Sequence, residues 1–238
     1  MTNDKTNHET ACLAVSVGQE YHEGEKLKVV VERINAQYRY VIIDVADTLQ
    51  RHNLALERGL SLTEAHTETR RLGDEWLDRN RNVLNTFTIP VRIDRWDSRL
   101  NHPDYEQTRK VFDLLYQNDQ KFRKAVGKDA RGYIHRRIRR GWNVPKEKAI
   151  IACTNYLLEE IAALTLFYRE NPCVTVYPAP PLRCFELVKK GEIEGAPKGL
   201  ENEGYEQIQF VPRPFNDNSP AHYVNHAHRA FCLDFLCR

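Results

Sequence analysis

One serine in this sequence stands where a nucleophile could work. Residues 11–18, ACLAVSVG, are typical of a strand buried on both faces, and Ser16 comes at its carboxyl end. The stretch AVSVG differs by one residue from the G-x-S-x-G nucleophile elbow of α/β hydrolases, because Ala14 takes the place of the first glycine. An elbow serine normally follows several strands, and no triad is evident downstream, although His226 and His228 are candidates. Two interpretations stay open at this point: a hydrolase nucleophile, or a strand-end serine that satisfies a backbone group.

A second pair of residues that could do chemistry lies in the stretch NYLLEEIAAL, residues 155–164. Tyr156 and Glu160 are four positions apart, so a helix would place them on one face. A carboxylate beside a phenol can hold an ammonium group and accept its proton. Taken alone, the spacing is more simply interpreted as an ordinary exposed pair on a helix surface.

Alternating strand-like and helix-like segments must position these residues. Strands are predicted at residues 11–18, 38–47, 88–99, 171–182 and 205–215, of which the third runs into a loop and the last is an edge strand. Helices are predicted at residues 23–37, 61–87, 102–140 and 145–168, and residues 48–59 form a short helix or a structured loop closed by Gly59. Ser61 and Glu64 predict a capping box, and a break is expected at Gly127 or Gly132.

This alternation predicts an α/β fold with a mostly parallel central sheet and helices on both faces. The polar residues 1–10 are expected to be a disordered tail, and residues 11–238 a single domain. In open parallel sheets the functional site lies beyond the carboxyl ends of the strands, where Ser16, Asp47 and Tyr177 would emerge together.

The composition argues against several classes of protein. No apolar run approaches the roughly 20 residues of a membrane span, and the first ten residues lack a signal-peptide core, so we expect a cytoplasmic protein. The six cysteines follow neither C-x-x-C nor Cys/His spacing, which disfavours a disulfide framework or a metal site. Residues 16–18 supply no G-x-G-x-x-G and no P-loop lysine, so no nucleotide cofactor is expected.

Four segments between residues 11 and 190 together resemble the tRNA-dependent cyclodipeptide synthases in order and spacing. They are the serine strand CLAVSVGQEY, the aspartate strand VIIDVAD, the helix stretch NYLLEEIAAL and the strand VTVYPAPPL. The family is similar to the catalytic domain of class Ic aminoacyl-tRNA synthetases, which implies a single Rossmann-like domain. The HIGH and KMSKS signatures of those synthetases do not occur in the sequence, so ATP-dependent activation of an amino acid is not expected.

Three positions divide this family into two subgroups, one with Asn, Tyr and His, the other with any residue, Tyr and Pro. The chain carries Gln19, Tyr177 and Pro178 and so resembles the second, X-Tyr-Pro subgroup. It departs from many members at Ala14, where they have a glycine two residues before the serine. The extra methyl group is expected to narrow the space around the first acyl group without changing the chemistry.

The resemblance implies roles for four catalytic candidates, Ser16, Tyr156, Glu160 and Tyr177. Ser16 would take the acyl group of a first aminoacyl-tRNA, and the terminal hydroxyl of that tRNA would help to move the proton. Glu160 and Tyr156 would bind the α-ammonium group of the aminoacyl-enzyme. Attack of this amine on a second aminoacyl-tRNA would give a dipeptidyl-enzyme, which would close to a diketopiperazine with Tyr156 and Tyr177 relaying protons. The implied enzyme is a monomer without cofactor, metal or membrane partner.

A tRNA partner should leave a basic footprint, and two helical stretches could provide it. By resemblance, the basic helix after the second strand binds the first tRNA, and the later stretch is a second candidate. Basic helices are also often only solvated surface. The residues are Arg70, Arg71, Arg79 and Arg81 in the first stretch and Arg136, Arg137, Arg139 and Arg140 in the second.

Matching to the family also implies a set of substrate-binding residues. By this matching, Cys12, Ala14, Ala163 and Thr175 line the first aminoacyl pocket. Gln19 and Pro178 hold the subgroup positions, and Asp44 and Asp47, close to a strand end, could meet a polar or basic side chain. Those expected around the first aminoacyl group are small or polar, which favours a polar or charged first residue, although Asp47 could simply cap the next helix. Two other functions stay open: a serine hydrolase with a downstream histidine, and a non-catalytic tRNA-binding protein that would tolerate Ser16→Ala.

Overall fold

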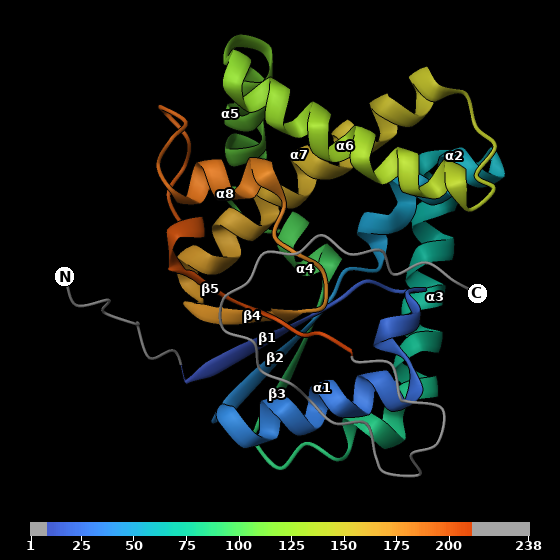
Figure 1. Ribbon diagram of the computed structural model, residues 1–238, viewed down its shortest axis with the longest axis vertical. Helices are drawn as coiled ribbons and strands as arrows, with labels where there is room; N and C mark the ends of the chain where they lie inside the picture. Colours follow the sequence, from blue (N-terminus) through green and yellow to red (C-terminus); the bar gives the residue numbers. More distant parts are fainter. Residues whose placement is uncertain (1–8, 211–238) are drawn as a thin grey trace. The chain divides into compact units, whose positions relative to one another are not determined.

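The strand that carries the serine, β1, is the middle strand of a five-stranded parallel sheet with the order β3-β2-β1-β4-β5 (Figure 1). The computed structural model describes residues 9–210, and those up to Ile208 form one compact unit. Small and branched apolar side chains of β1 are buried on both faces, as is usual for an interior parallel strand. The strands are β1 Thr10–Val15, β2 Tyr40–Val45, β3 Val91–Arg95, β4 Cys173–Tyr177 and β5 Glu203–Gln207.

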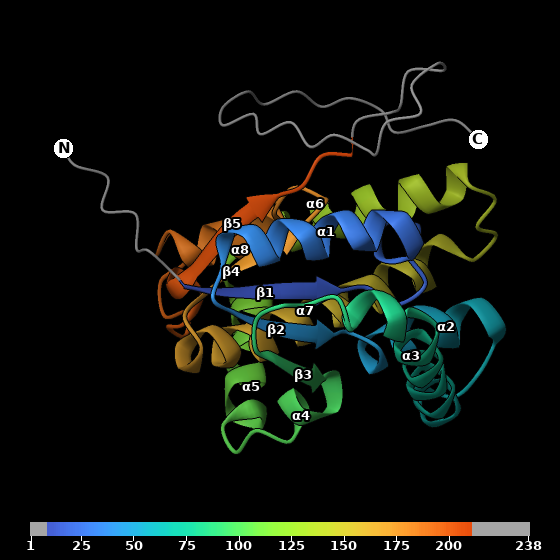
Figure 2. The same ribbon diagram turned by 90° about the horizontal axis from the view of Figure 1, so that it is seen from below.

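Helices cover both faces of this sheet, as Figure 2 shows. Helix α1, Gly24–Gln37, lies over one face, and helix α7, Lys146–Glu170, crosses the other. Cys12 and Ile42 share an apolar cluster with the buried side of α7. Because successive side chains of a strand point to opposite faces, their neighbours in sequence face α1. The predicted α/β architecture is therefore confirmed.

The remaining helices pack against α7, against α1 or against one another. They are α2 Arg51–Arg58, α3 Leu62–Leu84, α4 Trp96–Leu100, α5 Tyr105–Asn118, α6 Gln120–Arg139 and α8 Arg183–Lys189, with 3-10 turns η1 Glu20–His22, η2 Thr48–Gln50 and η3 Leu200–Asn202.

The predicted junction between α2 and α3 is confirmed in detail. Gly59 ends α2 in the left-handed conformation, with a φ of 64°. Ser61 and Glu64 then form the capping box: the N–H of Glu64 donates to Ser61 Oγ (3.2 Å), and the N–H of Ser61 donates to Glu64 Oε2 (2.8 Å).

The break predicted at Gly127 or Gly132 is wrong, because α6 runs through both glycines without interruption. The chain breaks instead at Asp119, whose backbone is extended and whose Oδ1 accepts the N–H of Phe122 (2.8 Å). An aspartate in this position caps the start of a new helix. A glycine within a helix lowers its stability but does not oblige the helix to end.

Several further segments differ from expectation or fall outside the described residues. The loop predicted after the third strand is the helix α4, and α8 has no counterpart in the prediction. The predicted edge strand is confirmed as β5, although it is shorter and begins at Glu203. Thr10 already belongs to β1, so only residues 1–8 of the predicted tail, together with residues 211–238 and thus His226 and His228, lie outside the described residues.

Helix α7 is long and apolar enough to cross a membrane by length and composition alone. In the fold, 61% of its most apolar stretch is buried, and it packs against α2, α5 and α6 as well as the sheet. Its hydropathy therefore reflects its place in the core of the fold.

Candidate active site

The candidate nucleophile opens a tight turn at the end of β1. The N–H of Gln19 donates to the carbonyl of Ser16 (3.2 Å), and Gly18, between them, has a φ of 84°. A positive φ at the third residue is characteristic of a type II turn, and glycine adopts it without strain. The N–H of His22 then donates to the carbonyl of Gln19 (2.9 Å), so η1 folds back toward Ser16. Ser16 is thus a turn residue whose side chain stays available for chemistry.

The hydroxyl of Ser16 meets a pair of tyrosines. Ser16 Oγ lies 3.0 Å from the hydroxyl of Tyr177, and that hydroxyl lies 2.8 Å from the hydroxyl of Tyr21. Tyr177 ends β4, which pairs directly with β1, so the sheet itself brings the two side chains together. Burial raises the pKa of Tyr177 and of Tyr21, so both phenols stay protonated at neutral pH. The expected meeting of Ser16 and Tyr177 is therefore present in the structure.

Tyr156 and Glu160 lie one turn apart on α7, as their spacing predicts. The Tyr156 hydroxyl accepts a hydrogen bond from Gln50 Nε2 (3.2 Å), while Glu160 Oε2 is buried without a hydrogen-bond partner among residues 9–210. Burial, helped by the charges of Asp44, Glu159 and Glu203, raises the pKa of Glu160 to about 8. The charge of Glu160 also raises the pKa of Tyr177, so the two groups belong to one electrostatic environment.

The carboxyl group next to Glu160 has the opposite surroundings. Glu159 accepts hydrogen bonds from Arg51 Nη1 (2.7 Å), His52 Nε2 (2.9 Å) and Trp96 Nε1 (2.9 Å). Burial opposes its ionisation, but the hydrogen bonds from His52 and Arg51 outweigh this and lower the pKa of Glu159. Glu159 therefore anchors α2 and α4 to α7 as a buried anion.

Two cavities flank these residues. One, of about 190 Å³, adjoins the serine turn and is lined by Gln19, Asp47, Gln50 and Tyr133 among others. The other, of about 250 Å³, lies between β3, α4 and the second half of α7. Its walls are largely polar and include Arg92, Asp94, Arg99, His102 and Ala163.

The predicted substrate-binding residues divide between these cavities and the sheet interior. Gln19 and Asp47 line the smaller cavity and Ala163 the larger one. Ala14 pairs in register with Asp44, whose carboxylate accepts two hydrogen bonds from Arg99 (2.7 and 3.0 Å).

Two predicted pocket residues, Cys12 and Thr175, are opposite each other on β1 and β4 and are buried. Thr175 Oγ1 donates to Glu203 Oε1 (2.7 Å) and also bonds Tyr168. Pro178 directly follows Tyr177 and accepts a hydrogen bond from Gln207 Nε2 through its carbonyl (3.2 Å).

Comparison with known proteins identifies the fold. No family model and no curated protein sequence matches the chain. Among solved structures, a cyclodipeptide synthase from Fluoribacter dumoffii is 28% identical, with a TM-score of 0.72 over 79% of this chain and 86% of that one. By its fold, the chain is similar to the cyclodipeptide synthases. The match agrees with the predicted resemblance and with the predicted class of enzyme.

More distant cyclodipeptide synthases have the same fold. One from Candidatus Glomeribacter gigasporarum, solved bound to Phe-tRNAPhe, is 18% identical with a TM-score of 0.66 over 89% of this chain and 93% of that one. A Mycobacterium tuberculosis protein, described as relating these synthases to type I tRNA synthetases, is 14% identical with a TM-score of 0.60 over 84% and 85%.

The basic residues predicted to bind tRNA fall into two groups in this cyclodipeptide synthase fold. All four arginines of α3 form ion pairs, and so does one arginine of α6. Their carboxylate partners are Asp97 for Arg70, Glu68 and Glu75 for Arg71, Glu23 for Arg79, Asp78 for Arg81 and Glu57 for Arg137. Arg136, Arg139 and Arg140, at the end of α6, form no ion pair within the described part of the chain.

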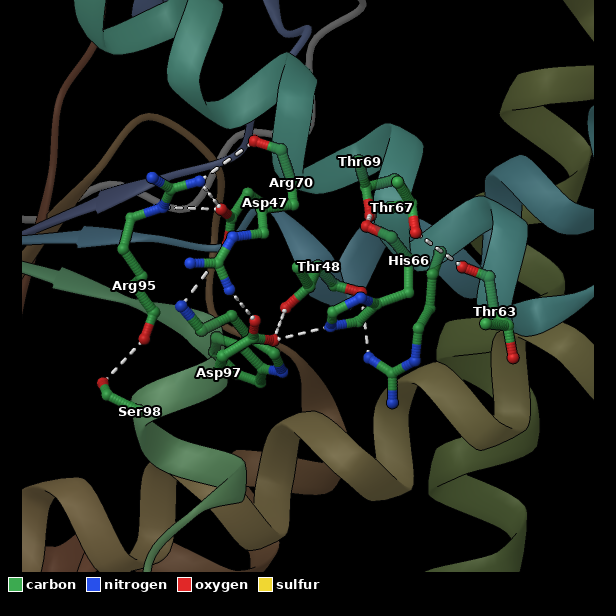
Figure 3. Close-up of polar contacts among 12 residues, drawn as sticks. Asp47, Thr48, Thr63, His66, Thr67, Thr69, Arg70, Arg95, Asp97 and Ser98 are labelled. Carbon is green, nitrogen blue, oxygen red and sulfur yellow. Dashed lines mark hydrogen bonds and ion pairs between the residues drawn. The ribbon is translucent and has the colours of Figure 1, made fainter.

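Figure 3 shows how the first half of α3 is tied to the sheet. The carboxylate of Asp97 accepts hydrogen bonds from Thr48 Oγ1 (2.6 Å), His66 Nε2 (2.9 Å) and Arg70 Nη1 (3.0 Å). Beside it, Arg95 donates to Asp47 Oδ2 through Nε (2.6 Å). The charge of Asp47 is therefore balanced by that of Arg95. Asp47 Oδ1 accepts the first N–H of α4 (3.3 Å), whereas the sequence suggested that Asp47 could cap the helix directly after it.

Sequence reasoning missed three parts of this site. Tyr21 and His22 lie five and six residues after Ser16, and only the return of the chain through η1 brings them back to it. Glu159 looks like one more charge beside Glu160 in the sequence, yet it is 2% exposed with three donors around it. The sequence signal that could have indicated this role is a glutamate set among the apolar residues of a helix that is expected to be buried.

Proposed function

We propose that the chain is a cyclodipeptide synthase that joins two amino acids from two aminoacyl-tRNAs through acyl intermediates on Ser16. One observation carries the proposal: at the carboxyl edge of the sheet, a serine hydroxyl bonds the hydroxyl of Tyr177, which feels the charge of Glu160, and Glu160 Oε2 is buried without a partner among the described residues. An acyl-carrying enzyme needs a nucleophile together with a group that can hold the amine of the bound acyl group.

The first step exchanges one ester for another. Ser16 Oγ attacks the carbonyl carbon of the aminoacyl-tRNA ester, the bond to the tRNA ribose oxygen breaks, and the serine proton leaves with the ribose hydroxyl. Because the substrate ester is already activated, the step requires no ATP. Tyr177 orients Ser16 Oγ through their hydrogen bond and can donate to the developing oxyanion, since its phenol stays protonated.

Glu160 then holds the α-amino group of the aminoacyl-enzyme. This amine has a pKa of about 7.7–8.0 in model peptides, close to that of the buried Glu160 carboxyl, so a proton is readily shared between them. Attack by the neutral amine on a second aminoacyl-tRNA forms a peptide bond and releases the second tRNA. Tyr156, held by Gln50, lies on the same face of α7 and can relay the proton.

Ring closure is intramolecular. The new terminal amine attacks the ester carbonyl on Ser16, the diketopiperazine forms, and the serine oxygen takes back a proton from the Tyr177 side. Holding amine and ester on one enzyme supplies most of the acceleration, because the two groups no longer have to meet by diffusion.

The cavities favour a polar or charged first amino acid. Cys12, Ala14, Ala163 and Thr175 are small or polar, and the larger cavity, which Ala163 lines, carries charges of both signs. Asp44 would meet the substrate only as part of its ion pair with Arg99. Gln19 and Asp47 line the smaller cavity next to the serine turn and are assigned to substrate binding there.

Membership of the X-Tyr-Pro subgroup is also part of the proposal. Gln19 contributes its backbone N–H to the serine turn, so the turn does not depend on its side chain, in keeping with a position where any residue occurs. Tyr177 and Pro178 supply the other two positions.

For tRNA, we assign the phosphate contacts to both basic stretches. Arg136, Arg139 and Arg140 are exposed, and the positive charge of Arg136 lowers the pKa of the Tyr177 phenol, which supports a tRNA contact close to the candidate catalytic residues. The α3 arginines would exchange their carboxylate partners for phosphates, and the pairs with the exposed Glu75 and Asp78 are of a kind that contributes little to stability. The absence of a metal, the monomeric state and the cytoplasmic location stay predictions.

Mass spectrometry tests the proposal directly. The purified protein is incubated with total bacterial tRNA charged with all amino acids, and the products and the intact protein are analysed. We expect a cyclic dipeptide and an aminoacyl adduct on Ser16, both lost in Ser16→Ala. A hydrolase would release free amino acids without a dipeptide, and a binding protein would retain the charged tRNA unchanged in both forms. Either result would contradict the proposal.

A further inference from the structure

One buried histidine next to the nucleophile has no part in the proposed chemistry. His22 is 0% exposed, and its Nδ1 accepts the backbone N–H of Ser16 at 3.0 Å. Its other ring nitrogen, Nε2, is buried without a hydrogen-bond partner among residues 9–210. Burying a polar ring nitrogen without a partner costs free energy. The one hydrogen bond that His22 does make is therefore the feature to explain.

The protonation state of His22 follows from its surroundings. Burial lowers the pKa of His22 to about 4, so the imidazole is neutral near pH 7. A neutral ring carries one proton, and because Nδ1 accepts from Ser16, that proton is on Nε2. The groups that face the ring are Tyr21, Tyr177, the main chain of Ser16 and, at a distance, the charge of Glu23.

His22 is itself held from several sides. The indole Nε1 of Trp76, a buried residue of α3, donates to the carbonyl of His22 (2.9 Å). The ring of His22 meets that of Tyr21 edge-on, with 4.6 Å between the ring centres, and its centre lies 5.6 Å from that of Tyr177. The histidine therefore touches both tyrosines of the Ser16 hydrogen-bond chain as well as the serine backbone.

The N–H that His22 accepts is the first one beyond the strand ladder. Register pairing of β1 with β2 ends at Val15 and Val45, so the N–H of Ser16 has no strand partner in the described sheet. The turn that follows is closed through the Ser16 carbonyl, which leaves the N–H side to be fixed by another group.

We propose that His22 is a positioning residue for the nucleophile. By accepting the Ser16 N–H at Nδ1, it fixes the main chain from which Oγ reaches the Tyr177 hydroxyl. It acts on the serine backbone and takes no proton from Oγ, since both Nδ1 contacts are to the N and O atoms of the Ser16 main chain. The kinetic consequence rests on the proposed function, whereas the hydrogen bond does not.

Two substitutions separate positioning from packing. His22→Asn places an amide oxygen where Nδ1 now accepts, while His22→Phe keeps a ring of similar size and removes the acceptor. Single-turnover formation of the Ser16 adduct is measured with charged total bacterial tRNA, beside thermal unfolding of each variant. We expect His22→Phe to lower the acylation rate roughly 10- to 100-fold with little change in KM, because a small displacement of a reacting group has effects of that order. His22→Asn should restore most of the rate.

A folded His22→Phe with wild-type acylation, or equal losses in both variants, would overturn the inference. Nitrogen-15 NMR of the wild-type histidine near pH 7 provides a second measurement that needs no substrate and no variant. We expect an unprotonated Nδ1 and a protonated Nε2, and a proton on Nδ1 would also overturn the inference. If the wild-type protein forms no adduct while this tautomer is observed, the proposed function fails and the role of His22 as a backbone acceptor stands.

Discussion

Two neighbouring carboxyl groups on α7 show how single residues acquire different properties from their surroundings. Glu159 has three hydrogen-bond donors and is held as an anion, whereas Glu160 lies buried and unpartnered among the described residues, and burial raises its pKa to about 8. Pairs of neighbouring acids whose pKa values are moved apart by their surroundings are typical of catalytic sites. A carboxyl group without a partner can bind an arriving amine and share a single proton with it, without having to displace an existing partner.

The raised pKa of Glu160 makes a prediction about stability. Between the unfolded value of 4.5 and about 8 the folded protein keeps a proton that the unfolded chain releases, so the free energy of unfolding should fall as pH rises through this window. The fall should approach roughly 1.4 kcal/mol per pH unit at its steepest. Glu160→Gln cannot ionise, so it should match the wild type near pH 5 and be more stable near pH 8. Urea denaturation at several pH values measures this, and parallel profiles would contradict it.

At the scale of elements, α7 is the part that organises the site. It carries Tyr156 and Glu160 toward the carboxyl edge of the sheet, and through Glu159 it anchors the helices that follow β2 and β3. Because Arg51 lies on α2 and Trp96 on α4, one carboxylate joins three helices.

Removal of this anchor should be costly. Glu159→Gln leaves Arg51 without its buried anion, and breaking a buried charge pair typically costs about 3–5 kcal/mol of folding free energy. Glu147→Gln, an exposed change on the same helix, serves as the control and should change stability by less than about 0.5 kcal/mol. Denaturant unfolding of both variants tests the role, and similar small effects would show that Glu159 is not an anchor.

A close approach of α3 to the end of β2 gives a second prediction at this scale. A Cβ on Gly73 would lie 2.6 Å from Asp47 Oδ2, inside the ion pair with Arg95, so Gly73→Ala should destabilise the fold by roughly 1–3 kcal/mol. The matched control is Gly132→Ala, where the new methyl group meets only Arg136 at 3.6 Å. This change should stabilise α6 by up to about 1 kcal/mol, as alanine usually does in a helix. The midpoint temperature of thermal unfolding should therefore fall in Gly73→Ala and rise in Gly132→Ala.

At the scale of the whole molecule, the net charge of +2 conceals an uneven distribution. The arginines of α3 are paired with carboxylates, whereas three arginines at the end of α6 form no ion pair among residues 9–210. A polyanion approaching the sheet edge would meet the α6 group as uncompensated charge.

Binding measurements at several salt concentrations test this view. The triple change Arg136→Gln, Arg139→Gln and Arg140→Gln should weaken binding of charged tRNA and reduce the slope of log K against log salt by about 0.7 for each phosphate that is no longer neutralised. The control makes the same change of charge at the other end of α6, with Arg123→Gln, Lys124→Gln and Lys128→Gln, and should leave the slope nearly unchanged. Equal effects of the two triples would assign tRNA binding to overall charge.

Local patterns were enough to predict much of this molecule. Apolar β-branched runs predicted the strands, the pair of Ser61 and Glu64 predicted the start of α3, and four-residue spacing placed Tyr156 and Glu160 on one helix face. The break between α5 and α6 was misplaced, because a glycine in a helix is a weak signal and the decisive hydrogen bond is made by Asp119.

What the sequence by itself determined is the set of elements and the few residue types able to do acyl chemistry, because these depend on neighbours within one or two turns. Only the tertiary structure decided which groups surround Ser16. Tyr21 and His22 return to it through a turn, Tyr177 comes from a strand 161 residues away, and Glu160 is raised to a pKa of about 8 by burial between elements. Desolvation and long-range hydrogen bonds arise only when distant segments pack together, and no local pattern encodes them.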